Sequence, residues 1–269
     1  GDIALLHCFQ PMHRLLCMAG GYSAFWGTYS FEGAVFAELA TYGTTATGST
    51  RDNLLHSRLI ILWGCNPAVT VYHANTGWYL AQARERGAKI VSIDPRYTAS
   101  TAMFAGQWIP IRPGADAAML IAMAYVIIKD GLQDQKFLDR YTVGFDRFKD
   151  YVTGLEDGVP KTPGWAEAIT GVPAATIEEL ARDYATMKPA ALWAGLAAGR
   201  TAYGEQYHRA AITLAAMTGN IGVRGGDAAG KAWGVVTGLY PFMKSGIGYA
   251  TGGNPVEDEA APRKDALGG

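Results

Sequence analysis

The amino-acid sequence predicts an α/β fold, a doubly wound and mostly parallel sheet with helices on both faces. Short apolar runs bounded by turn residues alternate with longer helical segments, and this alternation is typical of a sheet covered on both sides. One strand, one helix and a second strand fit within residues 58–94, which is the length of a parallel crossover unit.

Four brief apolar runs are the predicted strands, because each is too short for a helix and ends in turn residues. They are RLIILWG (58–64), AKIVSID (88–94), QWIPIR (107–112) and PAALWAG (189–195). Residues 75–87 predict a helix that stops at Gly87. A second helix is predicted over residues 115–129, with Asp116 in the first turn where the helix dipole favours a carboxylate. Further helices are predicted at 133–141, 163–169, 173–187 and 204–218.

The composition indicates a globular protein and argues against nucleic-acid binding and membrane insertion. The 269 residues are 49% hydrophobic and 17% charged, enough to bury a sizeable core. A formal net charge of -1 gives no field that would attract nucleic acid or an anionic membrane, so no nucleic-acid partner is expected. The longest apolar run, residues 117–128, is shorter than the roughly 18 residues of a membrane span, so no direct membrane insertion is expected either.

The three cysteines are too few and too scattered for a disulfide framework. The sequence contains no CxxC pair of the kind that binds zinc or an iron-sulfur cluster. The chain begins Gly1-Asp2 without methionine or a signal peptide. Such a start is expected of an excised or processed piece.

Polar and turn residues follow three of the predicted strands. In an open α/β sheet, ligands bind beyond the carboxyl ends of the strands, where the strand order reverses. The three endings are Gly64-Cys65-Asn66-Pro67, Asp94-Pro95-Arg96 and Arg112-Pro113-Gly114-Ala115-Asp116. Any one of them alone is as well explained by strand termination and helix capping, but three in succession favour a ligand site.

These endings suit a nucleotide. Gly64 allows backbone N–H groups to approach a diphosphate, and Asp94 offers an acceptor for ribose hydroxyls. Arg96 or Arg112 could fork onto a phosphate, and Asp116 could accept from a guanine edge. No GxGxxG follows the first strand, so an ordinary nicotinamide dehydrogenase is disfavoured.

Other candidates are weaker. Cys65 as a nucleophile needs a partner base that the sequence does not identify. His7 and His13 lie beside Cys8 and Cys17, but the four residues lack the spacing of a zinc site. Ser30 precedes a segment with apolar residues at helical spacing, which by itself indicates a helix N-cap.

The combination of endings resembles a known family. LIILWGCNP, GAKIVSIDPRYT and WIPIRPGADAAMLIAMAYVIIKDGLQDQKFLDRYTVGFD together resemble the catalytic subunits of the dimethyl sulfoxide reductase family of molybdenum enzymes. The likeness covers roughly residues 16–230 and is greatest to the anaerobic, membrane-associated dimethyl sulfoxide reductases. It implies that the chain is an internal fragment of a catalytic subunit that carries a molybdenum bis(molybdopterin guanine dinucleotide) cofactor.

The resemblance also implies roles for individual residues. Ser30, at the end of Gly27-Thr28-Tyr29-Ser30, matches the serine that ligates molybdenum in those relatives. One guanine dinucleotide arm would be held by residues of the strand ends and of a later loop, namely Gly64, Cys65, Asn66, Pro67, Ile93, Asp94, Pro95, Arg96, Arg112, Gly114, Asp116, Gly195 and Gly199. At Gly195 and Gly199 only backbone could make the contact.

By resemblance, three segments are expected. Residues 1–45 would be a partial segment that carries Ser30, residues 46–225 a Rossmann-like cofactor-binding domain, and residues 226–269 a glycine-rich tail. The cysteine-rich segment that binds a [4Fe-4S] cluster in relatives is not in this sequence, so the cluster is expected outside it. The fragment alone is expected to be inactive.

For the full-length protein, the resemblance implies two-electron oxygen-atom or hydroxyl transfer, with reduction of an S-oxide or N-oxide in anaerobic respiration. An iron-sulfur electron-transfer subunit and a membrane anchor subunit are expected as partners, and a periplasmic or cell-envelope location is expected from relatives. Two alternatives stay open: a non-catalytic nucleotide-binding or assembly module of the same fold, and a thiol-dependent enzyme that uses Cys65.

Overall fold

The computed structural model describes residues 15–20, 23, 30–45, 47–71 and 75–230. The chain divides into two units, one of Gly1–Gly27 with Thr237–Gly269 and one of Thr28–Val236. In the first unit, the described part contains a helical turn at residues 15–18. All elements named below belong to the second unit.

Four parallel strands form one sheet, and all four predicted strands are confirmed. They are β1 (Leu59–Trp63), β2 (Lys89–Ile93), β3 (Gln107–Ile109) and β4 (Ala190–Ala194). The strand order is β3-β2-β1-β4, and every neighbouring pair is parallel. The chain therefore moves outward from β1 through β2 to β3 and then returns to the other side of β1.

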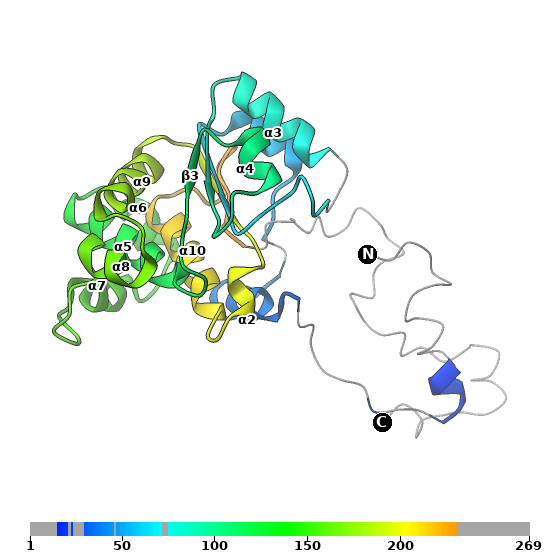
Figure 1. Ribbon diagram of the computed structural model, residues 1–269. Coiled ribbons are helices and arrows are strands. Elements are labelled where there is room, and N and C mark those ends of the chain that lie inside the picture. The colour runs from blue at the N-terminus through cyan, green and yellow to red at the C-terminus, as the bar shows by residue number, and fades with distance from the viewer. Residues whose placement is uncertain (1–14, 21–22, 24–29, 46, 72–74, 231–269) are drawn as a thin grey trace. The chain divides into compact units, whose positions relative to one another are not determined.

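Helices cover both faces of this sheet (Figure 1). Because successive strand residues point to opposite faces, β1 divides its side chains between two apolar cores. Leu59 and Ile61 pack with α5 (Asp116–Lys129), α8 (Pro163–Thr170), α9 (Ala174–Thr186) and α10 (Glu205–Met217). Ile60 and Leu62 pack with α3 (Thr76–Glu85), α4 (Ala99–Phe104) and the 3-10 helix η2 (Arg51–His56). The predicted doubly wound α/β fold is confirmed.

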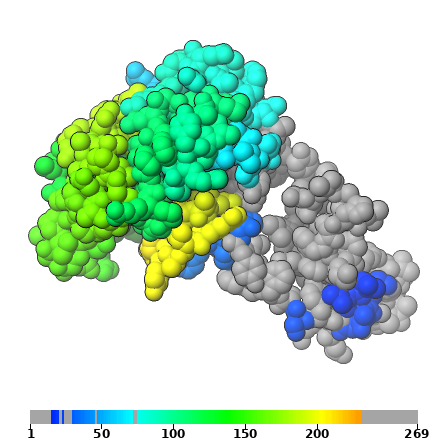
Figure 2. Space-filling model, in the orientation of Figure 1, coloured from blue at the N-terminus to red at the C-terminus, as the bar shows by residue number. Residues whose placement is uncertain are grey.

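The remaining elements are α2 (Glu32–Tyr42), α6 (Gln135–Tyr141), α7 (Phe145–Thr153) and the 3-10 helix η3 (Ala198–Arg200). In the space-filling view, the side chains of the helices fill the gaps between the ribbons on this face (Figure 2). Within the described residues, no helix is both long enough and apolar enough to cross a membrane.

The segment Gly225–Gly230, called the 225–230 strap, lies against the elements that precede β1. The Asn53 side chain accepts from the Gly225 N–H at 2.7 Å and donates to the Gly226 carbonyl at 2.7 Å. The Tyr42 hydroxyl donates to the Ala228 carbonyl at 2.7 Å. This part of the glycine-rich tail is therefore packed rather than loose, and it holds η2 in place.

Candidate functional site

A pocket lies at the point where the strand order reverses. After β3 the chain returns to place β4 beside β1, so the reversal falls between β1 and β4, where α/β sheets bind their ligands. A cavity of about 280 Å³ opens there beyond the carboxyl ends of the strands. It is lined by Arg51, Gly64, Cys65, Asn66, Pro67, Val69, Thr70, Thr76, Asp94, Arg96, Trp193, Gly195, Leu196, Ala197 and Arg200.

Gly64 and Gly195 line one side of this pocket, called its floor, where the ends of β1 and β4 are in close backbone contact. The Gly195 N–H donates to the Trp63 carbonyl at 2.7 Å, and a Cβ at position 195 would overlap the carbonyl of Gly64. Gly64 itself has φ +57, a left-handed conformation that glycine adopts without strain. No side chain fits at position 195, because the backbone at the end of β1 occupies the place of its Cβ.

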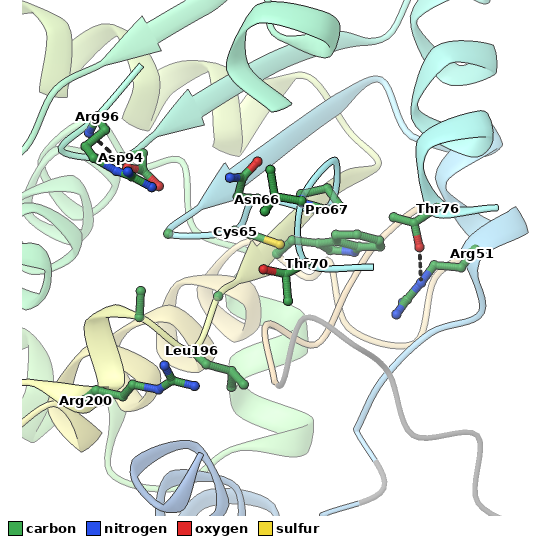
Figure 3. Close-up of a pocket in the computed structure, with 15 residues that line it drawn as sticks. Arg51, Cys65, Asn66, Pro67, Thr70, Thr76, Asp94, Arg96, Leu196 and Arg200 are labelled. Atoms are coloured by element: carbon green, nitrogen blue, oxygen red, sulfur yellow. Dashed lines mark hydrogen bonds between the residues drawn. The ribbon is translucent and has the colours of Figure 1, made fainter. Parts of the chain in front are cut away.

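Charged side chains are spread along the pocket (Figure 3). Asp94 and Arg96, which follow β2, lie at one end, and the Asp94 carboxylate accepts from the backbone N–H of Arg96 at 2.9 Å. Arg51 and Thr76 lie at the opposite end. The sequence predictions for Asp94 and Arg96 thus fall in one pocket with those for Gly64 and Gly195.

Arg51 is a pocket residue that the sequence analysis did not single out. Its Nε–H donates to the Thr76 hydroxyl at 3.2 Å, and its guanidinium lies over the Trp193 ring, 4.7 Å from the ring centroid. Burial lowers the pKa of the Arg51 guanidinium, while the neighbouring Cys65 and Asp227 oppose that shift. Only a three-dimensional arrangement reveals this position, because Arg51 precedes β1 and follows no strand.

Cys65 lies in the pocket wall but is not prepared for thiolate chemistry. Burial raises the pKa of the Cys65 thiol to about 12, although the Arg51 charge acts in the opposite direction. A thiol with that pKa stays protonated at neutral pH and is a poor nucleophile. The geometry gives no support to a thiol-dependent enzyme.

Asn66 and Pro67 shape the turn after β1. The Asn66 amide oxygen accepts from both the backbone N–H and the hydroxyl of Ser100, at 3.2 and 2.7 Å. The Ser100 hydroxyl in turn accepts from the Ala68 N–H at 2.9 Å. The Asn66 amide oxygen is therefore used to fix the pocket wall to the start of α4.

Several predicted residues lie outside the pocket lining. Arg112 donates to the Ala168 carbonyl at 3.0 Å and the Ile169 carbonyl at 3.3 Å, in the last turn of α8. Asp116 is buried and accepts from the Trp63 indole N–H at 2.8 Å; burial raises the pKa of its carboxyl and this hydrogen bond opposes the rise. Two further predicted residues, Ile93 and Pro95, flank Asp94: the first is buried in β2 and the second is exposed.

The other two predicted glycines, Gly114 and Gly199, pack against other parts of the chain. A Cβ at Gly199 would overlap the ring of His208 on α10. At Gly114, which has φ +80, a Cβ would lie 3.8 Å from Thr201. Neither glycine lines the cavity.

Ser30 is exposed, and it is linked to the pocket through its backbone. Its carbonyl accepts from the Arg200 Nε–H at 3.0 Å, and Arg200 lines the pocket. The N-cap position of α2 is taken by Phe31 rather than Ser30, so the structure does not use Ser30 as a helix cap. The rest of the predicted motif, residues 27–29, lies outside the described residues.

The described residues contain no group of three or more His, Cys, Asp or Glu side chains that could hold a metal ion. His7, Cys8 and His13 lie outside the part of the chain that the structure describes.

Comparison with known proteins places these features in a family. The family model described as molybdopterin oxidoreductase matches residues 8–263. The chain is 41% identical over 233 residues to dimethyl sulfoxide reductase DmsA of Escherichia coli, covering 81% of this chain and 29% of that protein. It is 33% identical over 263 residues to a trimethylamine-N-oxide reductase of Haemophilus influenzae, covering 92% of this chain and 30% of that protein.

The fold is similar to that of a solved enzyme. The structure of acetylene hydratase from Pelobacter acetylenicus matches with a TM-score of 0.64 and 27% identity, over 81% of this chain and 28% of that chain. The chain thus spans less than a third of the length of each of the three proteins it is compared with here.

Proposed function

Because this chain belongs to the molybdopterin oxidoreductase family, we propose that its pocket binds one guanine dinucleotide arm of a molybdenum bis(molybdopterin guanine dinucleotide) cofactor. The observation that carries this proposal is the glycine-floored cavity at the strand-order reversal. Nucleotides bind at this position in doubly wound folds.

The pocket residues fit such a group. Gly64 and Gly195 line the cavity without a side chain, so a diphosphate can approach their backbone atoms closely. Three guanidinium groups line the same cavity, and guanidinium is the side chain best suited to phosphate oxygens. Asp94 supplies an acceptor for sugar hydroxyls at the Arg96 end. When bound, the cofactor would supply two-electron redox chemistry at molybdenum.

We assign Ser30 the role of a molybdenum ligand in the full-length protein. Its side chain is exposed, and its hydroxyl makes no hydrogen bond to any other described residue. Its carbonyl contact with Arg200 keeps the residue next to the pocket. A serine oxygen is a hard donor, which suits a high-valent metal engaged in oxygen-atom transfer.

For the full-length protein we propose reduction of an S-oxide or N-oxide, in keeping with the names of the relatives. We further propose an iron-sulfur electron-transfer subunit and a membrane anchor subunit as partners, a [4Fe-4S] cluster outside this chain, and a periplasmic or cell-envelope location. The chain's own contribution is to bind and orient the cofactor.

The cofactor site is tested by a substitution that displaces the two glycines lining the cavity. In the full-length protein, Gly195→Ala is expected to lower the bound guanine nucleotide and molybdenum by at least about tenfold, because the new Cβ overlaps the Gly64 carbonyl. Nucleotide release on denaturation and metal analysis measure the loss.

Gly164→Ala in α8 is the matched control, since the nearest atom that its Cβ would meet is the Thr162 hydroxyl oxygen, 3.9 Å away. It should leave both contents unchanged. An unchanged nucleotide content in a folded Gly195→Ala protein would contradict the proposed site.

The metal ligand is tested separately. Ser30→Ala in the full-length protein should abolish most S-oxide or N-oxide reduction while leaving the guanine nucleotide content unchanged, because the oxygen donor is lost and the pocket is not. Ser23→Ala is the matched control, since both serines follow a tyrosine. Full activity in Ser30→Ala, or a loss confined to Ser23→Ala, would refute the assignment.

A further inference from the structure

Arg51 is held firmly at one end of the pocket, yet most of its hydrogen-bonding capacity is unused. The Nε–H donates to Thr76 and the guanidinium plane rests over Trp193. Among the residues that the structure describes, neither of its two terminal NH2 groups donates a hydrogen bond. A fixed guanidinium whose four terminal N–H groups donate to none of the described residues is suited to bind a pair of anionic oxygens.

The surroundings strengthen attraction for an anion. Arg51 is partly buried, and the apolar Val69 and Trp193 line the pocket with it, so its charge is less screened than at an open surface. Among the described lining residues, the single carboxylate is Asp94. The buried carboxyl of Asp227 also acts on Arg51, but from outside the lining of the cavity. Figure 3 places the Asp94 carboxylate at the other end of the pocket, beside Arg96.

We propose that Arg51 binds a phosphoryl group of the ligand at the end of the pocket remote from Asp94 and Arg96, and that Asn53 positions Arg51 for this role. The proposal rests on the proposed nucleotide function and deepens it, because it assigns a second anion-binding point to an extended, phosphate-containing ligand. Arg96 then serves the opposite end.

Asn53 is the positioning residue because it fixes the short helix that carries Arg51. Its side-chain amide exchanges two hydrogen bonds of 2.7 Å with Gly225 and Gly226. Ser57, directly after η2, donates to the Gly225 carbonyl at 2.7 Å. A Cβ at position 225 would overlap the carbonyl of His56. The 225–230 strap therefore holds η2 at its middle and at its C-terminal end.

The direct test measures binding of inorganic pyrophosphate, guanosine diphosphate and guanosine to the chain by calorimetry. Arg51→Met keeps the length of the side chain but removes its charge. Arg51→Met is expected to weaken the binding of pyrophosphate and of guanosine diphosphate by about tenfold to a hundredfold, which is the effect of losing hydrogen bonds to a charged group. Guanosine, which has no phosphate, should bind as before.

Arg86→Met is the matched control, since Arg86 is exposed at the end of α3 and lies outside the pocket. It should leave all three affinities unchanged. Pyrophosphate binding equal in Arg51→Met and the unchanged chain, or absent from both, would overturn the role of Arg51.

The two proposals fail differently. If guanosine diphosphate and guanosine bind but Arg51→Met changes neither, the nucleotide site stands and the inference about Arg51 falls. Pyrophosphate binding could depend on Arg51 while guanosine diphosphate binds no more tightly than pyrophosphate. In that case the anion site stands and the guanine nucleotide function falls.

A double-mutant cycle tests the positioning role. Asn53→Ala should weaken pyrophosphate binding several-fold. In the Arg51→Met background the same substitution should cause no further loss of affinity, because Asn53 acts through Arg51. A merely structural role would give a second, independent loss in the double variant. Equal losses from Asn53→Ala with and without Arg51 would therefore refute it.

Discussion

Asp227 is a buried carboxyl group within the 225–230 strap. It is 8% exposed, and its carboxylate accepts from the Ala229 N–H at 2.8 Å. Burial raises the pKa of Asp227 to about 7, while the Ala229 N–H, Arg51 and Ser49 oppose the rise and Glu38 adds to it. The strap therefore carries a proton at acidic pH that the unfolded chain would have released.

This proton makes stability depend on pH. Between the ordinary pKa near 3.8 and the folded pKa of about 7, the folded state binds more protons than the unfolded state, so stability falls as pH rises through that window and is level above it. Asp227→Asn removes the effect. Relative to the unchanged chain, the variant should gain about 2 to 3 kcal/mol between pH 5 and pH 8.

Urea denaturation at the two pH values measures the difference. Asp52→Asn serves as the control, since Asp52 is exposed on η2, and should show no such gain. A difference between Asp227→Asn and the unchanged chain that does not vary with pH would contradict the prediction.

At the residue scale, sequence reasoning found the pocket residues that directly follow strands. Gly64, Asp94, Arg96 and Gly195 follow strands and line the cavity, because the carboxyl ends of parallel strands meet at one edge. It did not find Arg51, whose place depends on η2 and the strap. Arg112 also follows a strand segment, but the α8 carbonyls bind it, and that competition is not visible in the sequence.

At the element scale, the turn after β1 and the helix α4 are joined through one amide group. Asn66→Ala should destabilise the chain by about 1 to 2 kcal/mol, because the Ser100 N–H and hydroxyl lose their shared acceptor. Thermal or urea unfolding measures the loss. Thr70→Ala, in the same turn with a hydroxyl that bonds to none of the described residues, should change stability by less than about 0.5 kcal/mol.

The strands could be predicted from the sequence, whereas the helices α4 and α7 were not predicted. β1, β2 and β4 were predicted because apolar runs buried on both faces differ strongly from their surroundings. α4 has six residues and depends on the Thr98 cap, which accepts from the Thr101 N–H. α7 buries Val152 alone. A helix as short as α4 carries little periodic apolar signal. α7 does place Phe145, Phe148 and Val152 at helical spacing, so its pattern was present in the sequence and was overlooked.

At the scale of the whole molecule, the sheet sets the order of stability. β1 is bonded on both sides and fully buried, whereas β3 is a three-residue edge strand with an exposed middle residue. Amide hydrogen exchange should therefore be slowest in β1 and fastest, among the four strands, in β3. Exchange in β1 as fast as in β3 would show that the sheet does not open from that edge.

The fold as a whole was predictable because strand and helix alternation determines a doubly wound sheet almost without alternatives. The segment limits expected at residues 45 and 225 stay a prediction. What the sequence could not show is how distant segments combine: the strap joins η2 across 173 positions, and no local pattern encodes a contact of that span.

The tie between Asn53 and the strap also imposes an order on biosynthesis. Residues 51–63 leave the ribosome early, but their partners at positions 225 and 226 follow more than 160 residues later. β1 and β2 gain their mutual pairing long before η2 acquires its clamp, since local units form as they emerge and distant contacts form last. Among the pocket residues that the structure describes, we therefore expect the Arg51 end to reach its final place after Gly64 and Gly195.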